Sequence, residues 1–421
     1  MKTEKPTVII GGGIIGLFTA YYLLKSGRKV VVFDSTDGSD GCSFGNAGMV
    51  VPSHFVPLAS PGIIEKGLKW LLDSESPFYI QPKISMSLLR WGLNFYKAAS
   101  EKNMLKSVPF LKEISLLSKS EYQKIEDSDD FKTGLMQKGL IMYCKTEKGL
   151  EEEIETAEWA NKIGIKAEVL NLNEIKIKEP HLNPEVAGGV FFPGDAHLNP
   201  GILIKNLKEY LVNNGVIFHH KTTIDNFEIS GDTVSMIKFS GKTQEIQDLV
   251  LATGSWSENL AKKLKIYLPV QAGKGYSISL KSEEKNQMRY PSILTEARVA
   301  MTPMMPDILR IGGTMEIGGI NHEKNMNRVK GIVKSIPVYF NDFPLQMPQK
   351  EDVWVGLRPC SPDGLPYIGG SKKIRNLYFN TAHAMMGVSL APGSGKLLAE
   401  IMNKHIVNMD VSGFETERFA Y

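Results

Sequence analysis

A glycine-rich turn between a strand and a helix lies near the N-terminus and constrains the fold more than any other feature. Residues 7–10 form a short apolar run, as expected of a parallel strand buried on both faces. Residues 11–16 follow in the pattern G-x-G-x-x-G, and residues 14–26 have the apolar spacing of a helix. A second β-branched run, residues 29–33, ends at Asp34. The pattern predicts a β-α-β unit, and hence a parallel sheet covered by helices.

Each part of this unit suits a dinucleotide. Gly11 makes the tight turn, Gly13 lets a pyrophosphate approach the backbone, and Gly16 lets the helix pack closely on the strand. The free N–H groups at the start of the helix favour phosphates. Asp34 can accept a hydrogen bond from a ribose 2′-hydroxyl, and an acid there favours an unphosphorylated ribose. The unit predicts an adenine dinucleotide, with FAD and NAD both open.

Composition and charge exclude several other classes of protein. The 421 residues contain 49 Lys and Arg against 46 Asp and Glu, and this near balance argues against nucleic-acid binding. Hydrophobic residues make up 42% of the chain, enough for a large buried core. Cys42, Cys144 and Cys360 are far apart and form no C-x-x-C pair. We therefore expect no disulfide framework and no metal bound by protein ligands.

The N-terminus has no secretory signal pattern, so we expect a cytoplasmic protein. Residues 62–95 are amphipathic enough to touch the inner face of a membrane, although burial against the core is the more ordinary explanation. The apolar residues that raise this alternative are Trp70, Leu71, Leu72, Leu88, Leu89 and Trp91.

The middle of the chain predicts helices and an antiparallel meander. Residues 168–184 are punctuated by proline and predict irregular structure. Helices are expected over 91–128, 151–162 and 202–212. Strands are expected over 139–143, 216–219, 226–229, 234–239, 245–252, 276–280, 293–301 and 309–315, those at 226–252 forming the meander.

Several motifs, taken in chain order, resemble the D-amino-acid oxidase superfamily of FAD-dependent oxidoreductases. After the first glycine motif come Ser-Phe-Gly-Asn-Ala-Gly at 43–48 and Gly-Asp-Ala-His-Leu-Asn-Pro at 194–200. Ala-Thr-Gly at 252–254 and Gly-Lys-Gly-Tyr-Ser at 273–277 follow. The last motif, Val-Gly-Leu-Arg-Pro-Cys-Ser-Pro-Asp-Gly, begins at residue 355. This order implies FAD rather than NAD.

The resemblance also implies an architecture. It is an α/β fold with an α+β cap, in which a Rossmann-like FAD-binding domain carries a discontinuous antiparallel-sheet substrate domain. Residues 1–84, 199–262 and 350–421 are predicted to form the FAD-binding domain. Residues 85–198 and 263–349 are predicted to form the substrate-binding cap.

Within the superfamily the chain looks most like the bacterial D-amino-acid dehydrogenases, and residues 46–54 look like the variants that oxidise D-hydroxyproline. The implied reaction is oxidation of the Cα–N bond of a D-amino acid, D-proline and cis-4-hydroxy-D-proline included. Residues 383–395 are nearer to the glycine-oxidase pattern, so a glycine- or sarcosine-type amine oxidase using oxygen stays open. So do an L-amino-acid deaminase and an FAD-binding subunit of a larger dehydrogenase. The electron acceptor is a quinone, a protein carrier or oxygen, and the oligomeric state is undetermined.

The resemblance assigns roles at the substrate. Arg358 matches the arginine that binds the substrate carboxylate, and a planar guanidinium suits that group. Tyr276 is either a second contact or a strand tyrosine packed on its face. His54, in the loop after the predicted flavin loop, either meets the substrate or is a histidine satisfied within its loop, and the resemblance places His383 near the flavin ring. Arg310 is either a further pocket cation or a strand-edge arginine.

FAD is expected to bind without a covalent link, because Gly356 stands where some relatives carry an attachment cysteine. The resemblance places FAD against the following residues: Gly11, Gly13, Ile14, Ile15, Gly16, Asp34, Ser35, Ser43, Asn46, Ala47, Gly48, Val50, Thr223, Thr253, Gly254, Trp256, Met386 and Gly387.

Overall fold

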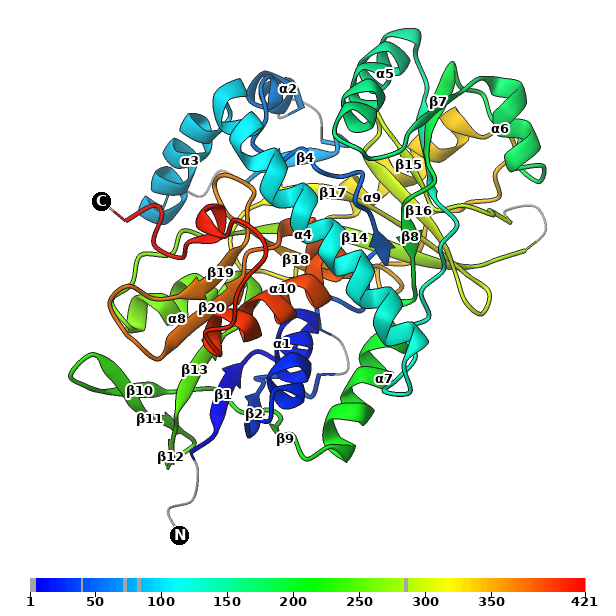
Figure 1. Cartoon of the computed structure of the whole chain (residues 1–421). Helices are drawn as coiled ribbons and strands as arrows, with labels where there is room; N and C mark the ends of the chain where they lie inside the picture. Colours follow the sequence, from blue (N-terminus) through cyan, green and yellow to red (C-terminus); the bar gives the residue numbers. More distant parts are fainter. Residues whose placement is uncertain (1–4, 39–40, 71–73, 82–84, 284–286, 421) are drawn as a thin grey trace.

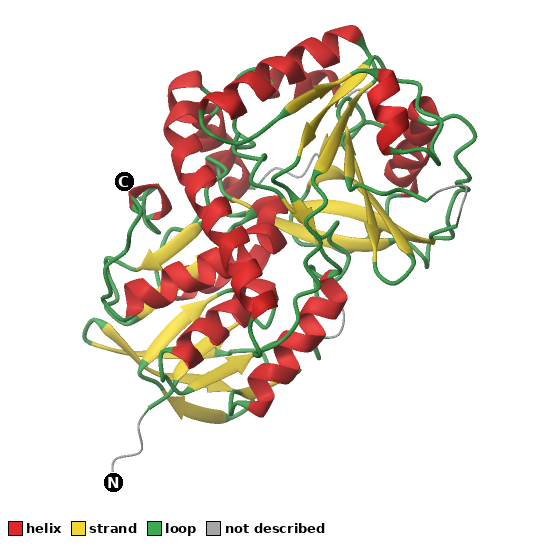
Figure 2. Cartoon of the chain, turned by 45° about the vertical axis from the view of Figure 1, so that its right-hand side comes forward, coloured by secondary structure: helices red, strands yellow, loops and turns green. Residues whose placement is uncertain are grey.

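The computed structural model describes residues 5–38, 41–70, 74–81, 85–283 and 287–420. Two large sheets form the two ends of the molecule, and a long helix, α4 (Glu101–Asp127), runs between them (Figure 1). Figure 2 shows the same division from a second direction, with helices across the middle of the molecule and along its upper edge.

The first sheet is the predicted parallel sheet. Its six strands lie in the order β19-β20-β13-β1-β2-β9, and β1 pairs in parallel with both β2 and β13. Apolar faces of the helices α1, α7 and α10 share one core with β1 and β2. The bounds are β1 (Thr7–Ile10), α1 (Ile14–Lys25), β2 (Val30–Phe33), α7 (Pro200–Asn213), β9 (Ile217–His219), β13 (Asp248–Leu251), β19 (Tyr367–Gly370), β20 (Leu377–Thr381) and α10 (Gly387–Met402).

The second sheet has nine strands and is mainly antiparallel. β14 pairs antiparallel with β17 on one side and with the edge strand β18 on the other, and helix α9 buries its apolar side against this sheet. The strands are β4 (Phe78–Ile80), β5 (Leu140–Cys144), β6 (Glu168–Leu170), β7 (Gly188–Phe192), β14 (Gln271–Lys281), β15 (Ser292–Leu294), β16 (Val299–Met304), β17 (Ile308–Ile317) and β18 (Trp354–Cys360). The helices around it are α5 (Glu147–Lys162), α6 (Leu172–Lys178) and α9 (Met326–Tyr339).

Smaller elements complete the fold. The meander is β10 (Asn226–Ser230), β11 (Thr233–Phe239) and β12 (Lys242–Glu245), and β3 (Met49–Val50) pairs with β8 (Ala196–His197). The helices α2 (Ile63–Trp70) and α3 (Met86–Ala98) lie at one edge, and α8 (Ser257–Lys263) follows β13 (Figure 1). Short 3₁₀ turns occupy Gly254–Trp256, Ala384–Met386 and Ser412–Phe414.

The predicted fold class is confirmed, and three local predictions are wrong. Residues 245–252 do not close the meander: β12 does so, and β13 leaves it to pair in parallel with β1. Residues 168–184 contain β6 and α6, since Asn171 and Glu174 form a capping box that starts the helix. Residues 293–301 turn back as the hairpin β15–β16.

The division into domains stays a prediction, and the structure shows which strands join which sheet. All six strands of the first sheet lie in the segments predicted to bind FAD. Two strands from those segments, β4 and β18, belong to the nine-stranded sheet. Helix α4 comes from the predicted cap but packs on α10, where the Tyr122 hydroxyl donates to the Val388 carbonyl at 2.6 Å.

Candidate active site

A cavity of about 1800 Å³ lies between the two sheets. One end is lined by the turns that follow β1, β2 and β13, and the other by β14, β18 and the loop of residues 51–60. Crevices at the carboxyl ends of parallel strands are where α/β sheets bind ligands. The volume is larger than a pocket for one small molecule needs.

The glycine turn opens into this cavity as a dinucleotide requires. Gly11 has φ +107°, and a Cβ there would lie 2.4 Å from the Ala252 carbonyl oxygen. A Cβ on Gly16 would lie 1.9 Å from the Gly11 carbonyl oxygen, so this glycine lets helix α1 touch the turn. A Cβ on Gly13 would meet nothing within 4 Å, which leaves open space at the helix N-terminus. The Asp34 carboxylate is held there by the backbone N–H of Gly12, at 2.6 Å.

The loop of residues 43–48 is fixed by the nine-stranded sheet. The Arg310 guanidinium donates to the Phe44 carbonyl at 3.0 Å, and the Ser277 hydroxyl donates to the Gly45 carbonyl at 2.9 Å. The Asn46 side chain accepts from the Gly48 N–H at 2.8 Å and closes the turn. Arg310 thus lies under the loop, outside the cavity lining, where it positions the chain.

Arg358 lines the cavity from β18 and is largely surrounded by protein. Its guanidinium donates to the carbonyls of Thr314 and Gly313, and no carboxylate in the described ranges pairs with it. Burial lowers the pKa of this group because the charged form loses water. A buried guanidinium with uncompensated charge is a site for an anion. Gly275 on the neighbouring strand makes room for it, since a Cβ there would lie 2.4 Å from its central carbon.

The Tyr276 hydroxyl is engaged away from Arg358. It donates to Glu316 at 2.9 Å, and Glu316 also pairs with Lys274 at 3.1 Å in a fully buried ion pair. Desolvation by burial is the main reason that the pKa of Tyr276 is raised, which keeps the phenol protonated. Tyr276 is one of the residues that line the cavity, and its hydroxyl anchors the pair of strands β14 and β17.

His383 lies in a strained turn between β20 and α10. The residues on either side, Ala382 and Ala384, have φ +65° and +47°. The imidazole is buried, with Nε2 2.9 Å from the Ser394 hydroxyl. Its Nδ1 has no hydrogen-bond partner in the part of the chain that is described. Burial lowers the pKa of His383 to about 3, so the ring is neutral.

His54 lines the cavity from the loop that follows β3. Its Nδ1 lies 3.0 Å from the Ser53 hydroxyl, and that hydroxyl donates to the fully buried Asp195 at 2.5 Å. Neither Ser53 nor Asp195 was selected from the sequence as a site residue. The sequence signal that could have pointed to Asp195 is its place in Gly-Asp-Ala-His: an acid that follows a buried strand, with no Lys or Arg close to it in the sequence.

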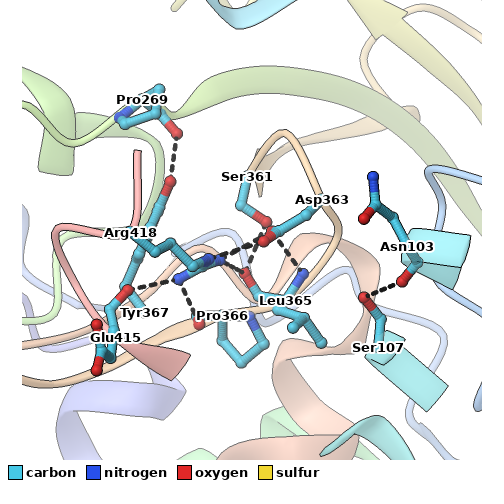
Figure 3. Close-up of polar contacts among 10 residues, drawn as sticks. All are labelled: Asn103, Ser107, Pro269, Ser361, Asp363, Leu365, Pro366, Tyr367, Glu415 and Arg418. Atoms are coloured by element: carbon cyan, nitrogen blue, oxygen red, sulfur yellow. Dashed lines mark hydrogen bonds and ion pairs between the residues drawn. The ribbon is translucent and has the colours of Figure 1, made fainter. Parts of the chain in front are cut away.

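The loop after Arg358 is held by the C-terminal segment. The Arg418 guanidinium donates to both carboxylate oxygens of Asp363, at 2.7 and 2.8 Å, and to the Leu365 carbonyl at 2.7 Å (Figure 3). The Ser361 hydroxyl also donates to Leu365, so the turn between β18 and β19 is tied at several points (Figure 3). This turn fixes the end of the strand that carries Arg358.

Comparison with known proteins decides the family. The family model described as FAD dependent oxidoreductase (DAO) matches residues 7–401. The chain belongs to this family of FAD-dependent oxidoreductases. A D-amino acid dehydrogenase of Helicobacter pylori (strain J99) is 30% identical over 400 residues, 94% of this chain and 95% of that protein. One from Granulibacter bethesdensis is 29% identical over 421 residues, covering 98% of this chain and 99% of its own.

Solved structures show the same fold. Glycine oxidase from Geobacillus kaustophilus superimposes with a TM-score of 0.78 at 20% identity, covering 98% of each chain. L-amino acid deaminase from Proteus vulgaris, with its specific insertion deleted, gives 0.73 at 16% identity and covers 100% of this chain and 95% of its own. The predicted family, fold and cofactor, FAD rather than NAD, are confirmed.

The cavity of this FAD-dependent oxidoreductase fits the cofactor. The open space at Gly13 and the fixed carboxylate of Asp34 suit a pyrophosphate and a ribose. The assignment of individual residues stays a prediction. Of the residues predicted to bind FAD, those that line the cavity are Gly11, Gly13, Ile14, Ile15, Asp34, Ser35, Ser43, Asn46, Ala47, Thr223, Thr253, Gly254, Trp256, Met386 and Gly387.

Three residues predicted to bind FAD lie outside the cavity lining. Gly16 permits the contact of helix and turn described above. Gly48 has φ +69° and passes close to the Leu198 carbonyl, and Val50 is buried in β3. All four residues predicted at the substrate, Arg358, Tyr276, His54 and His383, line the cavity. Among the described residues no three His, Cys, Asp or Glu side chains gather as a metal site requires.

Proposed function

We propose that this flavoenzyme oxidises the Cα–N bond of a D-amino acid to the imino acid. The observation that carries the proposal is Arg358, a partly buried guanidinium that lines the cavity and lacks a carboxylate partner in the described chain. An α-amino acid supplies that carboxylate. The D configuration rests on the D-amino acid dehydrogenases that are about 30% identical over almost the whole chain.

The protein's contribution is orientation. Arg358 binds the carboxylate through two parallel N–H donors, which fixes the amino acid in the cavity. FAD, when bound, supplies the group that accepts two electrons and the α-hydrogen. Neutral His383 places an unpartnered ring nitrogen close to the start of α10, as a polar contact inside an otherwise apolar turn. Gly356, against which the Trp354 ring packs, offers no side chain for a covalent link, so FAD is held without one.

The finer substrate assignment is a cyclic D-amino acid, D-proline or cis-4-hydroxy-D-proline. It rests on residues 46–54, which resemble the hydroxyproline-oxidising variants; six of these nine residues line the cavity. Glycine or sarcosine oxidation with oxygen and L-amino-acid deamination are the alternatives.

The electron acceptor is proposed to be reached at the inner face of a membrane. Helix α3 exposes Met86, Leu89, Leu93 and Tyr96, each at least half exposed, along one side. Its charged residues are Arg90 and Lys97, with no acid in the helix, which suits an anionic surface. Trp91 is buried, and the side chains of Trp70, Leu71 and Leu72 lie outside the described part. No helix in the described chain is long and apolar enough to cross a bilayer.

An anaerobic titration of the purified holoenzyme tests the proposal, with flavin absorbance followed against matched D- and L-amino acids. Bleaching by D-amino acids alone supports it, and fastest bleaching by cis-4-hydroxy-D-proline or D-proline supports the finer assignment. Bleaching only by glycine, sarcosine or L-amino acids overturns it. The same protein, mixed with air, a soluble quinone or a protein carrier, shows which acceptor restores the colour.

A further inference from the structure

Two side chains, His54 and Ser53, connect the cavity to the buried carboxylate of Asp195. The Ser53 hydroxyl lies between His54 Nδ1, at 3.0 Å, and Asp195 Oδ2, at 2.5 Å. The Ser53 N–H donates to the other oxygen of Asp195 at 3.2 Å, so one residue holds the whole carboxylate. Asp195 is 0% exposed, whereas His54 lines the cavity. The mechanism described above uses neither Ser53 nor Asp195.

The hydrogen bonds that link His54, Ser53 and Asp195 allow two arrangements of their protons. An ionised Asp195 only accepts, so Ser53 donates to it and accepts in turn from the Nδ1–H of His54. His54 Nε2 is then an unprotonated acceptor. A protonated Asp195 donates to Ser53, Ser53 donates to His54 Nδ1, and the ring proton stands on Nε2. The two states differ by one proton, and the imidazole is neutral in both.

The surroundings favour these two states over a charged imidazole. Burial, with the charge of Arg298 as a smaller cause, lowers the pKa of His54 to about 4. Burial raises the pKa of Asp195 to about 7, against hydrogen bonds from Ser53 and the charge of Lys119 on α4. Glu153 on α5 faces Arg298 and also has a pKa raised to about 7 by burial. The proton is therefore held more readily by the carboxylate than by the ring.

We propose that His54, Ser53 and Asp195 form a relay that removes the ammonium proton of the substrate before oxidation. The inference rests on the proposed function, because it needs an amino acid in the cavity. The substrate N–H bond breaks and His54 Nε2 takes the proton. His54 Nδ1 gives its proton to the Ser53 oxygen, and the Ser53 hydroxyl proton passes to Asp195. The products are a free amine, whose lone pair assists loss of the α-hydrogen, and a neutral carboxylic acid.

The variant Asp195→Asn tests the relay. The Asn amide can donate to Ser53 but cannot take up a proton. The variant therefore stays in the second state, with the ring proton of His54 on Nε2. Glu179→Gln is the matched control, since Glu179 is equally buried and its pKa is also raised to about 7, yet its carboxylate lies outside the cavity and, among the described residues, accepts from the backbone N–H groups of Arg289 and Tyr290.

The assay is stopped-flow flavin reduction at limiting D-amino acid under anaerobic conditions, from pH 5.5 to 10. In the wild type and in Glu179→Gln the rate rises through an inflection near pH 7. In Asp195→Asn the rate at pH 7 falls at least tenfold, and the inflection moves up to the pKa of the free substrate ammonium, so high pH restores the rate. An unchanged inflection in Asp195→Asn overturns the relay, and so does a loss that is equal at every pH.

A measurement without substrate gives an independent answer. In ¹⁵N-histidine-labelled holoenzyme, with the His54 signals assigned from His54→Gln, the wild type at pH 8.5 shows the proton on Nδ1 and Asp195→Asn shows it on Nε2. The same tautomer in both proteins refutes the relay. If D-amino acids do not reduce the flavin of the wild type, the proposed function fails instead, and the tautomer measurement still reports on the hydrogen-bond chain.

Discussion

Replacing Arg358 by Ala removes the positive charge at the proposed carboxylate site. Within the described residues this guanidinium is hydrogen-bonded only to the carbonyls of Thr314 and Gly313, so the substrate carboxylate is what compensates its charge. Truncating one partner of a buried, hydrogen-bonded ion pair costs about 3–5 kcal/mol. That corresponds to a roughly 150- to 4000-fold rise in the substrate dissociation constant, at 1.4 kcal/mol per factor of ten.

The assay is anaerobic reduction of the bound flavin over a range of D-amino acid concentrations. The half-saturating concentration of Arg358→Ala rises by that factor while the visible flavin spectrum is retained. The amine that lacks the carboxylate is equally poor with both proteins, because there is nothing left for the guanidinium to bind. A half-saturating concentration that stays within threefold of the wild type refutes the assignment.

A second variant leaves the charge in place. Gly275→Ala puts a Cβ 2.4 Å from the guanidinium carbon of Arg358, which must then move. Gly275 lies outside the left-handed region of backbone conformation, so the strand itself is not strained. Weaker substrate binding with normal flavin content shows that the position of the guanidinium matters as well as its charge.

The remaining predictions concern the cofactor turn, the C-terminal clamp and pH. Gly13→Ala keeps the melting temperature of the apoprotein but weakens FAD binding, whereas Gly16→Ala, whose Cβ meets backbone at 1.9 Å, costs about 1–3 kcal/mol of stability; flavin fluorescence and thermal melts separate them. Arg418→Ala breaks a largely buried bidentate pair and costs about 3 kcal/mol in urea unfolding, while Arg375→Ala breaks an exposed pair and costs about 0–1 kcal/mol. Glu179 has a folded pKa of about 7, so the native state holds a proton that the unfolded state loses from about pH 4.5, and stability falls as pH rises to 7. Glu179→Gln therefore reduces the drop in melting temperature between pH 5 and pH 7.5, and an undiminished drop contradicts the assignment.

The glycine turn shows how far local sequence reaches. The strand, turn, helix and acid of residues 7–34 all occur as predicted, because each is specified by neighbours within a few residues. The same reasoning failed at residues 245–252. A strand that follows two hairpin strands usually pairs with them. In the folded protein β13 instead pairs in parallel with β1, which lies some 240 positions away in the sequence.

The predicted site residues divide in the same way. Motifs predict Arg358, His54, Tyr276 and His383, since residue identity and spacing are visible in the sequence, and all four line the cavity; their roles stay predictions. The sequence does not show that the Tyr276 hydroxyl donates to Glu316, because the two residues lie on strands β14 and β17, which come together only in the folded sheet.

The sequence by itself determined the β-α-β turn, the family and the FAD chemistry, since these depend on local conformation and on motifs that survive at about 30% identity. Only the tertiary structure decided which charges are left uncompensated and which polar groups meet. The ends of β18 and β17 and the loop after β3 come together around one cavity, and the turn before β8 holds Asp195 behind that loop. Burial removes water from Arg358 and from Asp195. The loss of water makes an anion a favourable partner for the guanidinium, and it raises the pKa of the carboxylate to about 7.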